Sequence, residues 1–265
     1  MKLNNGLEIP SLGFGTYLSK NEEVKAAVLA ALEAGYRHID TAMIYENEEG
    51  VGEAIKESGV PREEIFVTTK LWNEDIRNGN AEEALKLSLK KLQLDYIDLY
   101  LIHWPAKGYV NAWNQMIDLQ KQGLIKSIGV SNFNIHHLED LEPSGVVPVV
   151  NQIECHPKLQ QNELLAYCSE REIVIQAWGP LMQAKLFEDE TLKDIGEQYG
   201  KSTAQVMLRW HFQRGVNALP KSVTPSRIKA NFEIFDFELS AEDMKKITAM
   251  NEDQRVGPDP ETFDF

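Results

Sequence analysis

Cysteine is scarce in this chain: its 265 residues include two, Cys155 and Cys168. They match neither a CxxC pair nor the His/Cys spacing of a zinc site, so the sequence indicates neither a disulfide framework nor a structural zinc. Free cysteines usually pack as small hydrophobic residues. We therefore expect two buried thiols in a reducing compartment.

Positive charge is also in short supply, with 27 Lys and Arg against 41 Asp and Glu, for a net charge of −14. Such a surface repels phosphate backbones and anionic lipid heads, so we expect neither a nucleic-acid nor a membrane partner. The N-terminal stretch Met1 to Gly15 lacks the apolar segment of a secretory signal, and no uncharged apolar run reaches the roughly 18 residues of a membrane span. These absences predict a cytoplasmic protein.

What the chain does contain is a regular alternation of short apolar runs and longer amphipathic stretches. The runs are typical of strands buried on both faces of a parallel sheet. They are Tyr36 to Asp40, Ile65 to Lys70, Tyr96 to Ile102, Ser127 to Val130, Val149 to Ile153, Ile173 to Trp178, Val216 to Pro220 and Glu233 to Phe237. The amphipathic stretches predict helices, for example at Glu22 to Ala34, Ala81 to Leu92, Ala112 to Gln122 and Thr203 to Gln213.

Eight strand–helix repeats are compatible with a closed (β/α)₈ TIM barrel or an open doubly wound sheet. The open sheet of a dinucleotide-binding protein needs GxGxxG after its first strand, but the stretch from Gly13 to Leu18 lacks the third glycine and precedes the first repeat. We therefore predict the barrel, as a single domain over residues 1–265. Met1 to Leu12, with Asn5-Gly6 between apolar flanks, predicts a short β-hairpin that caps its N-terminal mouth.

Polar and aromatic side chains recur where the predicted strands end. They are Asp40, Lys70, His103, Ser131, Asn132, Gln152, Trp178, Lys221 and Ser222. In a barrel these ends meet around one mouth, which is where TIM barrels hold their active sites. Each residue alone has an ordinary structural explanation, but their recurrence at the same end of successive strands favours a site.

The types of residue in this set suggest proton transfer. A lysine beside Asp40 stays charged, and its charge favours the phenolate form of a nearby tyrosine. Tyr45 follows Asp40 closely enough to reach the rim, so we expect it to act as a general acid whose pKa Lys70 lowers. His103 could then orient a substrate oxygen, and Trp178 offers a flat face to an aromatic cofactor ring.

A second group of polar residues follows the strand at Val216 to Pro220. It consists of Lys221, Ser222, Val223, Thr224, Arg227 and Asn231. On a chain of net charge −14 such a group indicates an anion site, and TIM barrels often bind phosphate in this part of the fold. An exposed loop followed by a helix start is the alternative.

The same residues, in the same order, resemble the aldo-keto reductase family. The similar stretches are LGFGTY (12–17), GYRHIDTAMIYENEEGVGEAI (35–55), VTTKLWN (67–73), DLYLIHWP (98–105), SIGVSNF (127–133), VNQIECHP (150–157), AWGPL (177–181) and LPKSVTPSRIKAN (219–231). They span almost the whole chain, and the most similar members are bacterial reductases of glyoxal, methylglyoxal and 2,5-diketogluconate. The resemblance implies one (β/α)₈ barrel, acting as a monomer, that reduces aldehydes and ketones with NADPH, with NADH less favoured.

The resemblance also implies a role for each residue. Tyr45 would donate the proton, Lys70 and Asp40 would lower its pKa, and His103 would orient the carbonyl. The implied cofactor-binding set is Thr16, Asp40, Ser131, Asn132, Gln152, Trp178, Pro180, Leu181, Lys221, Ser222, Val223, Arg227 and Asn231. Ser131, Asn132 and Gln152 would hold the nicotinamide carboxamide and Trp178 would stack on the ring. Lys221, Ser222 and Arg227 would bind the 2′-phosphate and Asn231 the adenine. The substrate wall would consist of Tyr17, Trp72, His103 and Trp104.

Two positions depart from the family pattern. Ala230 stands where members commonly have Glu, and Gly179 stands where many have Ser. These changes affect the expected cofactor affinity and leave the reaction type unchanged. The connection Pro105 to Val110 and the tail after Asn251 are both short, so we expect an open, shallow pocket that accepts small or polar carbonyls.

Three alternatives stay open at this point. Lys70 could form a Schiff base in a lyase, although Asp40 would hold it protonated. The chain could be a binding or structural protein with the same fold. That interpretation is favoured only where the four catalytic residues of the family are replaced, and here all four are present. His38 alternates with Asp40 and could suggest a metal site, but His103 is the only other histidine at a strand end, so we expect no metal.

Overall fold

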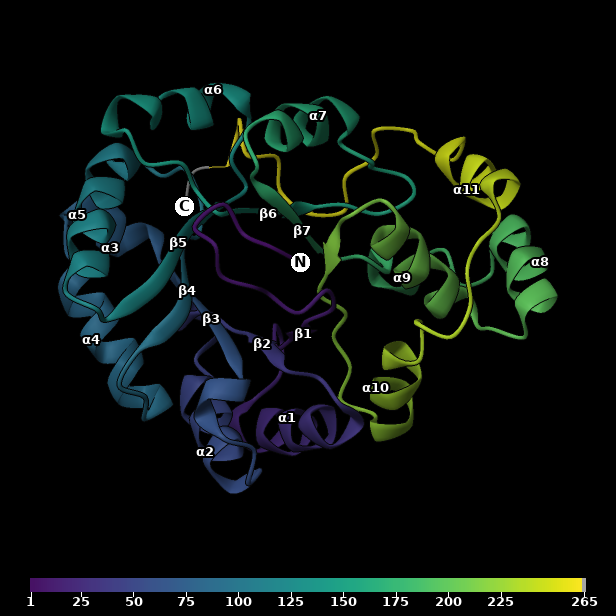
Figure 1. The fold of residues 1–265 in the computed structure, drawn as a ribbon, viewed down its shortest axis with the longest axis horizontal. Coiled ribbons are helices and arrows are strands. Elements are labelled where there is room, and N and C mark those ends of the chain that lie inside the picture. The colour runs from purple at the N-terminus through teal and green to yellow at the C-terminus, as the bar shows by residue number, and fades with distance from the viewer. Residues whose placement is uncertain (264–265) are drawn as a thin grey trace.

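The computed structural model describes residues 1–263, in which eight parallel strands form a ring inside a layer of helices (Figure 1). The strands are β1 (Phe14–Gly15), β2 (His38–Asp40), β3 (Phe66–Leu71), β4 (Ile97–Ile102), β5 (Ile125–Ser131), β6 (Val150–Glu154), β7 (Val174–Trp178) and β8 (Asn217–Ala218). They pair in chain order. The Gly13 and Gly15 N–H groups donate to the carbonyls of Ala218 and Pro220, both at 3.0 Å, and join the two ends of the sheet. The predicted barrel is confirmed.

The α-helices are α1 (Asn21–Ala34), α2 (Glu48–Glu57), α3 (Asn73–Asn78), α4 (Ala81–Leu92), α5 (Tyr109–Lys121), α6 (Ile135–Glu139), α7 (Asn162–Glu170), α8 (Glu190–Tyr199), α9 (Thr203–Gln213), α10 (Pro225–Phe232) and α11 (Ala241–Thr248). The predicted ranges of α4 and α9 agree with the structure at both ends. Local signals explain several boundaries. Gly35 ends α1 with a φ of 109°, and the Ser240 hydroxyl accepts from the Asp243 N–H at the start of α11.

One predicted strand is wrong. Residues Glu233 to Phe237 are not a strand, and the eighth strand of the ring is instead β1, at Phe14–Gly15. The 233–237 segment packs against α9, where Arg209 donates to the carbonyl of Ile234 at 3.0 Å and Gln205 donates to that of Glu233 at 3.1 Å. Apolar alternation alone does not distinguish such a segment from an edge strand.

The predicted hairpin closes the amino-terminal end of the barrel. Lys2 and Glu8 form an antiparallel bridge around the Asn5-Gly6 turn. Leu3 and Ile9 of the hairpin cluster with Leu99 and Leu101 of β4 inside the ring. In Figure 1 the N-terminal segment crosses the centre of the ring. The carboxyl-terminal end is therefore the mouth at which strand-end side chains can meet a ligand.

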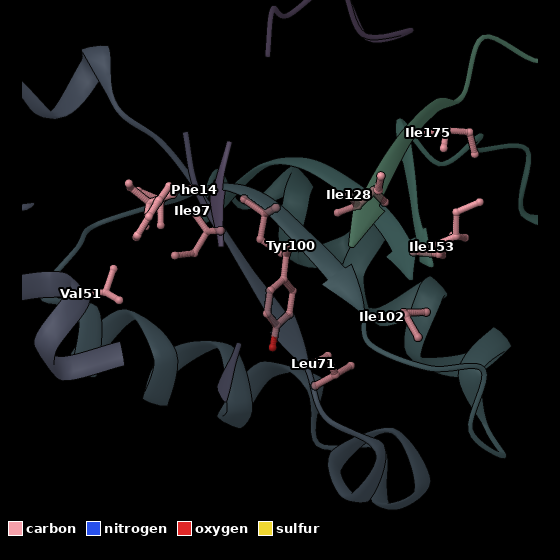
Figure 2. Packing of buried hydrophobic residues seen from close by; sticks show 14 of the residues in the cluster. Phe14, Val51, Leu71, Ile97, Tyr100, Ile102, Ile128, Ile153 and Ile175 are labelled. Atoms are coloured by element: carbon pink, nitrogen blue, oxygen red, sulfur yellow. The ribbon is translucent and has the colours of Figure 1, made fainter. Parts of the chain in front are cut away.

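The outer faces of the strands form the main hydrophobic core. In β4, Tyr100 and Ile102 alternate with the inward-facing Leu99 and Leu101 and belong to the cluster beneath the helices. Figure 2 shows Tyr100 and Ile102 together with Leu71 of β3 and Val51 of α2 in this layer. Burial on both faces explains why the strand sequences are nearly continuous in apolar residues.

The closure of the ring leaves no room for a side chain at Gly13 and little room for one at Gly15. A Cβ atom on Gly13 would lie 2.5 Å from His38 Nδ1, and one on Gly15 would lie 3.2 Å from the Leu219 carbonyl oxygen. Glycine at these positions lets β1 approach β8 closely. His38 itself is fully buried and its Nε2 lies 3.0 Å from the Thr68 hydroxyl, so it is a packed barrel residue.

The chain after α11 returns across the carboxyl-terminal mouth and reaches α6 (Figure 1). The Val256 and Gly257 N–H groups donate to the buried Glu154 carboxylate at the end of β6, at 2.6 and 3.2 Å. Further on, the Phe263 ring lies 4.1 Å from that of Trp104. Within residues 1–263, none of the helices has both the length and the apolar character needed to cross a membrane.

Candidate active site

Lys70, near the end of β3, is the centre of the site. Its side chain is fully buried, and its Nζ donates to Asp40 Oδ1 at 2.6 Å, to the Thr41 carbonyl at 2.8 Å and to the Tyr45 hydroxyl at 3.5 Å. These three acceptors use all three N–H groups of an ammonium. Lys70 is therefore held in its charged form and offers no lone pair for Schiff-base formation.

Tyr45 reaches this cluster from a short 3₁₀ turn, Met43–Tyr45, that follows β2. Its ring lies 5.7 Å from that of His103, which directly follows β4. The predicted substrate wall surrounds the pair: Tyr17 lies 5.0 Å from Tyr45, and Trp72 lies 5.1 Å from His103, measured between ring centroids. The structure thus brings the four predicted catalytic residues together at one mouth.

The pKa shifts decide which protonation states these groups hold. Burial raises the pKa of Tyr45 well above its ordinary value of 10.0, and the charge of Asp40 adds to the rise. This is opposite to the lowering expected from Lys70, because the burial of the phenol is the largest influence on its pKa and the negative charge of Asp40 acts in the same direction. Burial, aided by the Lys70 charge, lowers the pKa of His103 well below 6.5. Burial also lowers the pKa of Lys70, an effect that Asp40 opposes. At neutral pH the site therefore holds a protonated phenol beside a neutral imidazole.

A second set of contacts links the ends of β5 and β7. Trp178 Nε1 donates to Asn132 Oδ1 at 2.8 Å, and Asn132 Nδ2 donates to the His103 carbonyl at 3.0 Å and to the Ser131 hydroxyl at 3.1 Å. Asn132 adopts a left-handed backbone with a φ of 63°. These bonds hold the indole of Trp178 in a defined orientation beside the catalytic cluster, with its side chain partly exposed at the mouth.

Two further predicted residues are tied to Asp40. Thr16, almost fully buried, donates its hydroxyl to the Asp40 carbonyl at 2.9 Å. Gln152 Nε2 donates to Asp40 Oδ2 at 2.7 Å and to Gln176 Oε1 at 3.0 Å. Gln176 was not among the residues predicted from the sequence. Its signal was a polar residue within the apolar run of β7, two positions before Trp178.

The predicted anion group lies beyond β8 and along α10. Lys221 and Arg227 are exposed, and neither forms an ion pair with a carboxylate anywhere in residues 1–263. Ser222 is partly exposed and Val223 is exposed, while Asn231 is buried on α10. Two further predicted residues follow β7: Pro180 is buried and Leu181 is partly buried. Unpaired cations on an acidic protein fit a phosphate group.

The short tail forms part of the mouth, which sequence reasoning missed. A Cβ atom on Gly257 would lie 2.3 Å from the Trp178 indole, so the tail packs directly against this residue. The anchoring Glu154 carboxylate also lies 3.0 Å from His156 Nε2. On the opposite side of the mouth, Tyr17 and Ile44 are exposed. The tail thus covers the mouth beside Trp178, while the side chain of Tyr17 is exposed to solvent.

One group of potential metal ligands occurs in the described chain, formed by His136, His137 and Glu261 on the surface. His137 Nδ1 already accepts from the Asn134 N–H at 3.1 Å, as part of the cap of α6. A neutral imidazole that accepts at Nδ1 carries its proton on Nε2, so neither nitrogen is ready to bind a metal. This group lies outside the catalytic cluster.

Comparison with known proteins agrees with this geometry. Residues 11–252 match the family model described as the aldo/keto reductase family. The chain is 53% identical to the glyoxal reductase of Bacillus subtilis, covering 100% of this chain and 97% of that protein. It is 51% identical to the methylglyoxal reductase DkgA of Escherichia coli, over 99% and 97%. The crystal structure of a Bombyx mori aldo-keto reductase in complex with NADP is 40% identical, with a TM-score of 0.92 over 97% of this chain and 94% of that one.

A family match over most of the chain, together with full-length relatives at about half identity, establishes the family. The expectations of the fold and of the enzyme class are confirmed with it. The chain belongs to the aldo/keto reductase family.

Proposed function

We propose that this enzyme reduces small aldehydes and ketones, with dicarbonyls such as methylglyoxal and glyoxal as its preferred class, using NADPH. The observation that carries the proposal is the contact of the buried Lys70 ammonium with both Asp40 and the Tyr45 hydroxyl. It places a protonated phenol next to a fixed positive charge at an open barrel mouth. The names of the relatives, glyoxal reductase and methylglyoxal reductase, support the substrate class.

In the proposed mechanism Tyr45 donates its hydroxyl proton to the carbonyl oxygen. His103, neutral because its pKa is lowered, donates a hydrogen bond that aligns the same oxygen. Lys70 stabilises the negative charge that Tyr45 acquires as its proton leaves, and Asp40 keeps Lys70 in place. The raised pKa of Tyr45 means that its phenolate is unfavourable on its own. The nearby Lys70 charge therefore has its largest effect as the proton leaves and the phenolate forms.

The residues present fit NADPH, since two cations without an ion-pair partner in the described chain, Lys221 and Arg227, and hydrogen-bonded amides occupy the expected positions. When bound, NADPH supplies the hydride. Asn132, Ser131 and Gln152 would hold the carboxamide and Trp178 the ring. Lys221, Ser222, Val223 and Arg227 would bind the 2′-phosphate and Asn231 the adenine, with Thr16, Pro180 and Leu181 lining the path. Tyr17, Trp72 and Trp104 would enclose the substrate.

We further propose that residues 1–265 act as one domain and as a monomer in the cytoplasm. In support, all four catalytic residues come from one chain, and both cysteines are free thiols buried in the protein. The Schiff-base alternative is disfavoured, since the N–H groups of Lys70 are all engaged. Borohydride treatment with a keto substrate should leave Lys70 unmodified.

A spectrophotometric screen of NADPH consumption tests the function directly. We expect turnover with methylglyoxal and glyoxal, lower turnover with 2,5-diketogluconate and simple aldehydes, and less activity when NADH replaces NADPH. Absence of NADPH oxidation with every carbonyl in the panel would refute the proposal.

A further inference from the structure

A row of buried amides crosses the interior of the barrel just below the catalytic cluster. In the sheet register Gln152 of β6 pairs with Gln176 of β7, and Gln176 pairs with Asn217 of β8. Register neighbours project to the same side of a sheet, so the three side chains lie in one layer. Gln152 is 2% exposed, and Gln176 and Asn217 are fully buried.

These amides form a continuous hydrogen-bonded chain. Asn217 Nδ2 donates to the Pro10 carbonyl at 2.5 Å, Gln176 Nε2 donates to Asn217 Oδ1 at 3.0 Å, and Gln152 Nε2 donates to Gln176 Oε1 at 3.0 Å. The other N–H of Gln152 donates to Asp40 Oδ2 at 2.7 Å. The chain thus connects the amino-terminal hairpin to the catalytic carboxylate.

The direction of every amide in this chain is determined by its ends. A backbone carbonyl can only accept, so Asn217 must turn its NH₂ group to Pro10 and its oxygen to Gln176. Gln176 must then present its NH₂ group to Asn217 and its oxygen to Gln152. The ionised Asp40 is also an acceptor only. Both N–H groups of Gln152 are therefore used, and its Oε1 accepts from no group within the described residues 1–263.

We propose that Gln176 is a positioning residue that sets the direction of the Gln152 amide, so that the Gln152 oxygen alone faces the ligand and accepts from a carboxamide NH₂ group. This inference rests on the proposed role of Gln152 in cofactor binding. With Gln176 present, Gln152 is held at two points and its plane is fixed. With the bond to Asp40 alone, the Gln152 amide can pivot and present an N–H to the ligand.

The test uses two cofactors that differ in this one group. The probes are NADP⁺ and its 3-acetylpyridine analogue, in which a methyl group replaces the carboxamide NH₂. Because the analogue cannot donate to Gln152, the wild-type enzyme should bind it about fivefold to tenfold more weakly than NADP⁺, the effect of one hydrogen bond. Gln176→Met should reduce this ratio to within about twofold, since a pivoting Gln152 can donate to the acetyl oxygen. Gln176→Glu keeps the acceptor for Gln152, and in its protonated form, which burial favours, it still donates to Asn217 Oδ1, so it should retain the ratio.

Controls separate this role from general destabilisation. Gln160→Met removes another fully buried glutamine amide, one that donates to backbone carbonyls near α11, and should leave the ratio unchanged. Adenosine 2′,5′-bisphosphate, which lacks the nicotinamide, should bind wild type and Gln176→Met equally. Equal binding of both cofactors by the wild type, or an unchanged ratio in Gln176→Met, would overturn the inference. If Gln152→Met also binds both cofactors as the wild type does, the proposed role of Gln152 fails as well.

Discussion

Two buried carboxylates, those of Asp40 and Asp98, lie at opposite ends of the barrel. Asp40 ends β2 at the catalytic mouth, and Asp98 lies near the start of β4 at the hairpin end. Each accepts from a cation at 2.6 Å, from Lys70 Nζ and Arg62 Nη2 respectively. The pairs differ in exposure, because the side chain of Lys70 is 0% exposed and that of Arg62 is 22% exposed.

The pairs differ more in what the cation does with its remaining donors. Arg62 donates to the carbonyls of Ile65 and Tyr96, and Asp98 accepts from the Val67 N–H, so this pair joins backbone segments. Lys70 instead donates to the hydroxyl of Tyr45, a side chain that can exchange a proton. An ion pair of similar geometry thus joins backbone segments at one end of the barrel and, in the proposed mechanism, assists proton transfer at the other.

Of the variants considered, Tyr45→Phe should cause the largest loss of kcat. The ring contacts remain while the proton donor is lost, so kcat for methylglyoxal reduction should fall by about 10³-fold or more, whereas NADPH affinity stays the same. Steady-state kinetics and a fluorescence titration with NADPH measure the two quantities. Turnover close to that of the wild type would show that another group donates the proton.

Lys70→Met should have the next largest effect. Removing the cation leaves Asp40 buried without its charge partner, so kcat should fall by about 10²-fold and the free energy of unfolding by about 3–5 kcal/mol. The loss of the positive charge also raises the pKa of Tyr45 further. Since the proposed mechanism uses the protonated phenol, any remaining activity should persist to higher pH than in the wild type. A basic limb that moves to lower pH would contradict this assignment.

Arg227→Ala extends the comparison to a cation that has no carboxylate partner within residues 1–263. Here the expected loss is in binding: the KM for NADPH should rise about tenfold, equivalent to about 1.4 kcal/mol, while that for NADH stays within about twofold. Lys229→Ala, on the same helix, is the matched control and should change neither value. An equal rise for both cofactors would exclude contact with the 2′-phosphate.

Asp98→Asn should have the smallest effect on catalysis. It weakens the charge-assisted bond to Arg62 and should lower the free energy of unfolding by about 1.5–3 kcal/mol, with kcat and KM unchanged within about twofold. Urea denaturation and steady-state kinetics measure the two effects. A large loss of kcat in a folded variant would mean that the two ends of the barrel are coupled.

The sequence allowed the location of the candidate site residues to be predicted because their positions follow from periodicity. Asp40, Lys70 and His103 each come at the end of an apolar run, and the carboxyl ends of parallel strands share one mouth. The strand β1 has two residues, too few for any period to be recognised, so the more regular segment at 233–237 was preferred to it.

Other features depend on contacts between distant segments. The direction of the pKa shift at Tyr45 is the net result of burial, Asp40 and Lys70, and no spacing in the sequence reveals how deeply each is buried. The orientation of Gln152 depends on side chains from three strands and on the Pro10 carbonyl. The packing of Gly257 on Trp178 joins residues that are far apart along the chain.

The glycines of the Gly13-Phe14-Gly15 stretch also bear on how short motifs are interpreted. In this chain the two glycines allow the first strand, β1, to lie close to the last strand, β8. A methyl group at Gly13 would collide with the imidazole of His38. Searches that score GxG stretches as dinucleotide fingerprints will therefore return false positives from barrels whose first and last strands meet in this way.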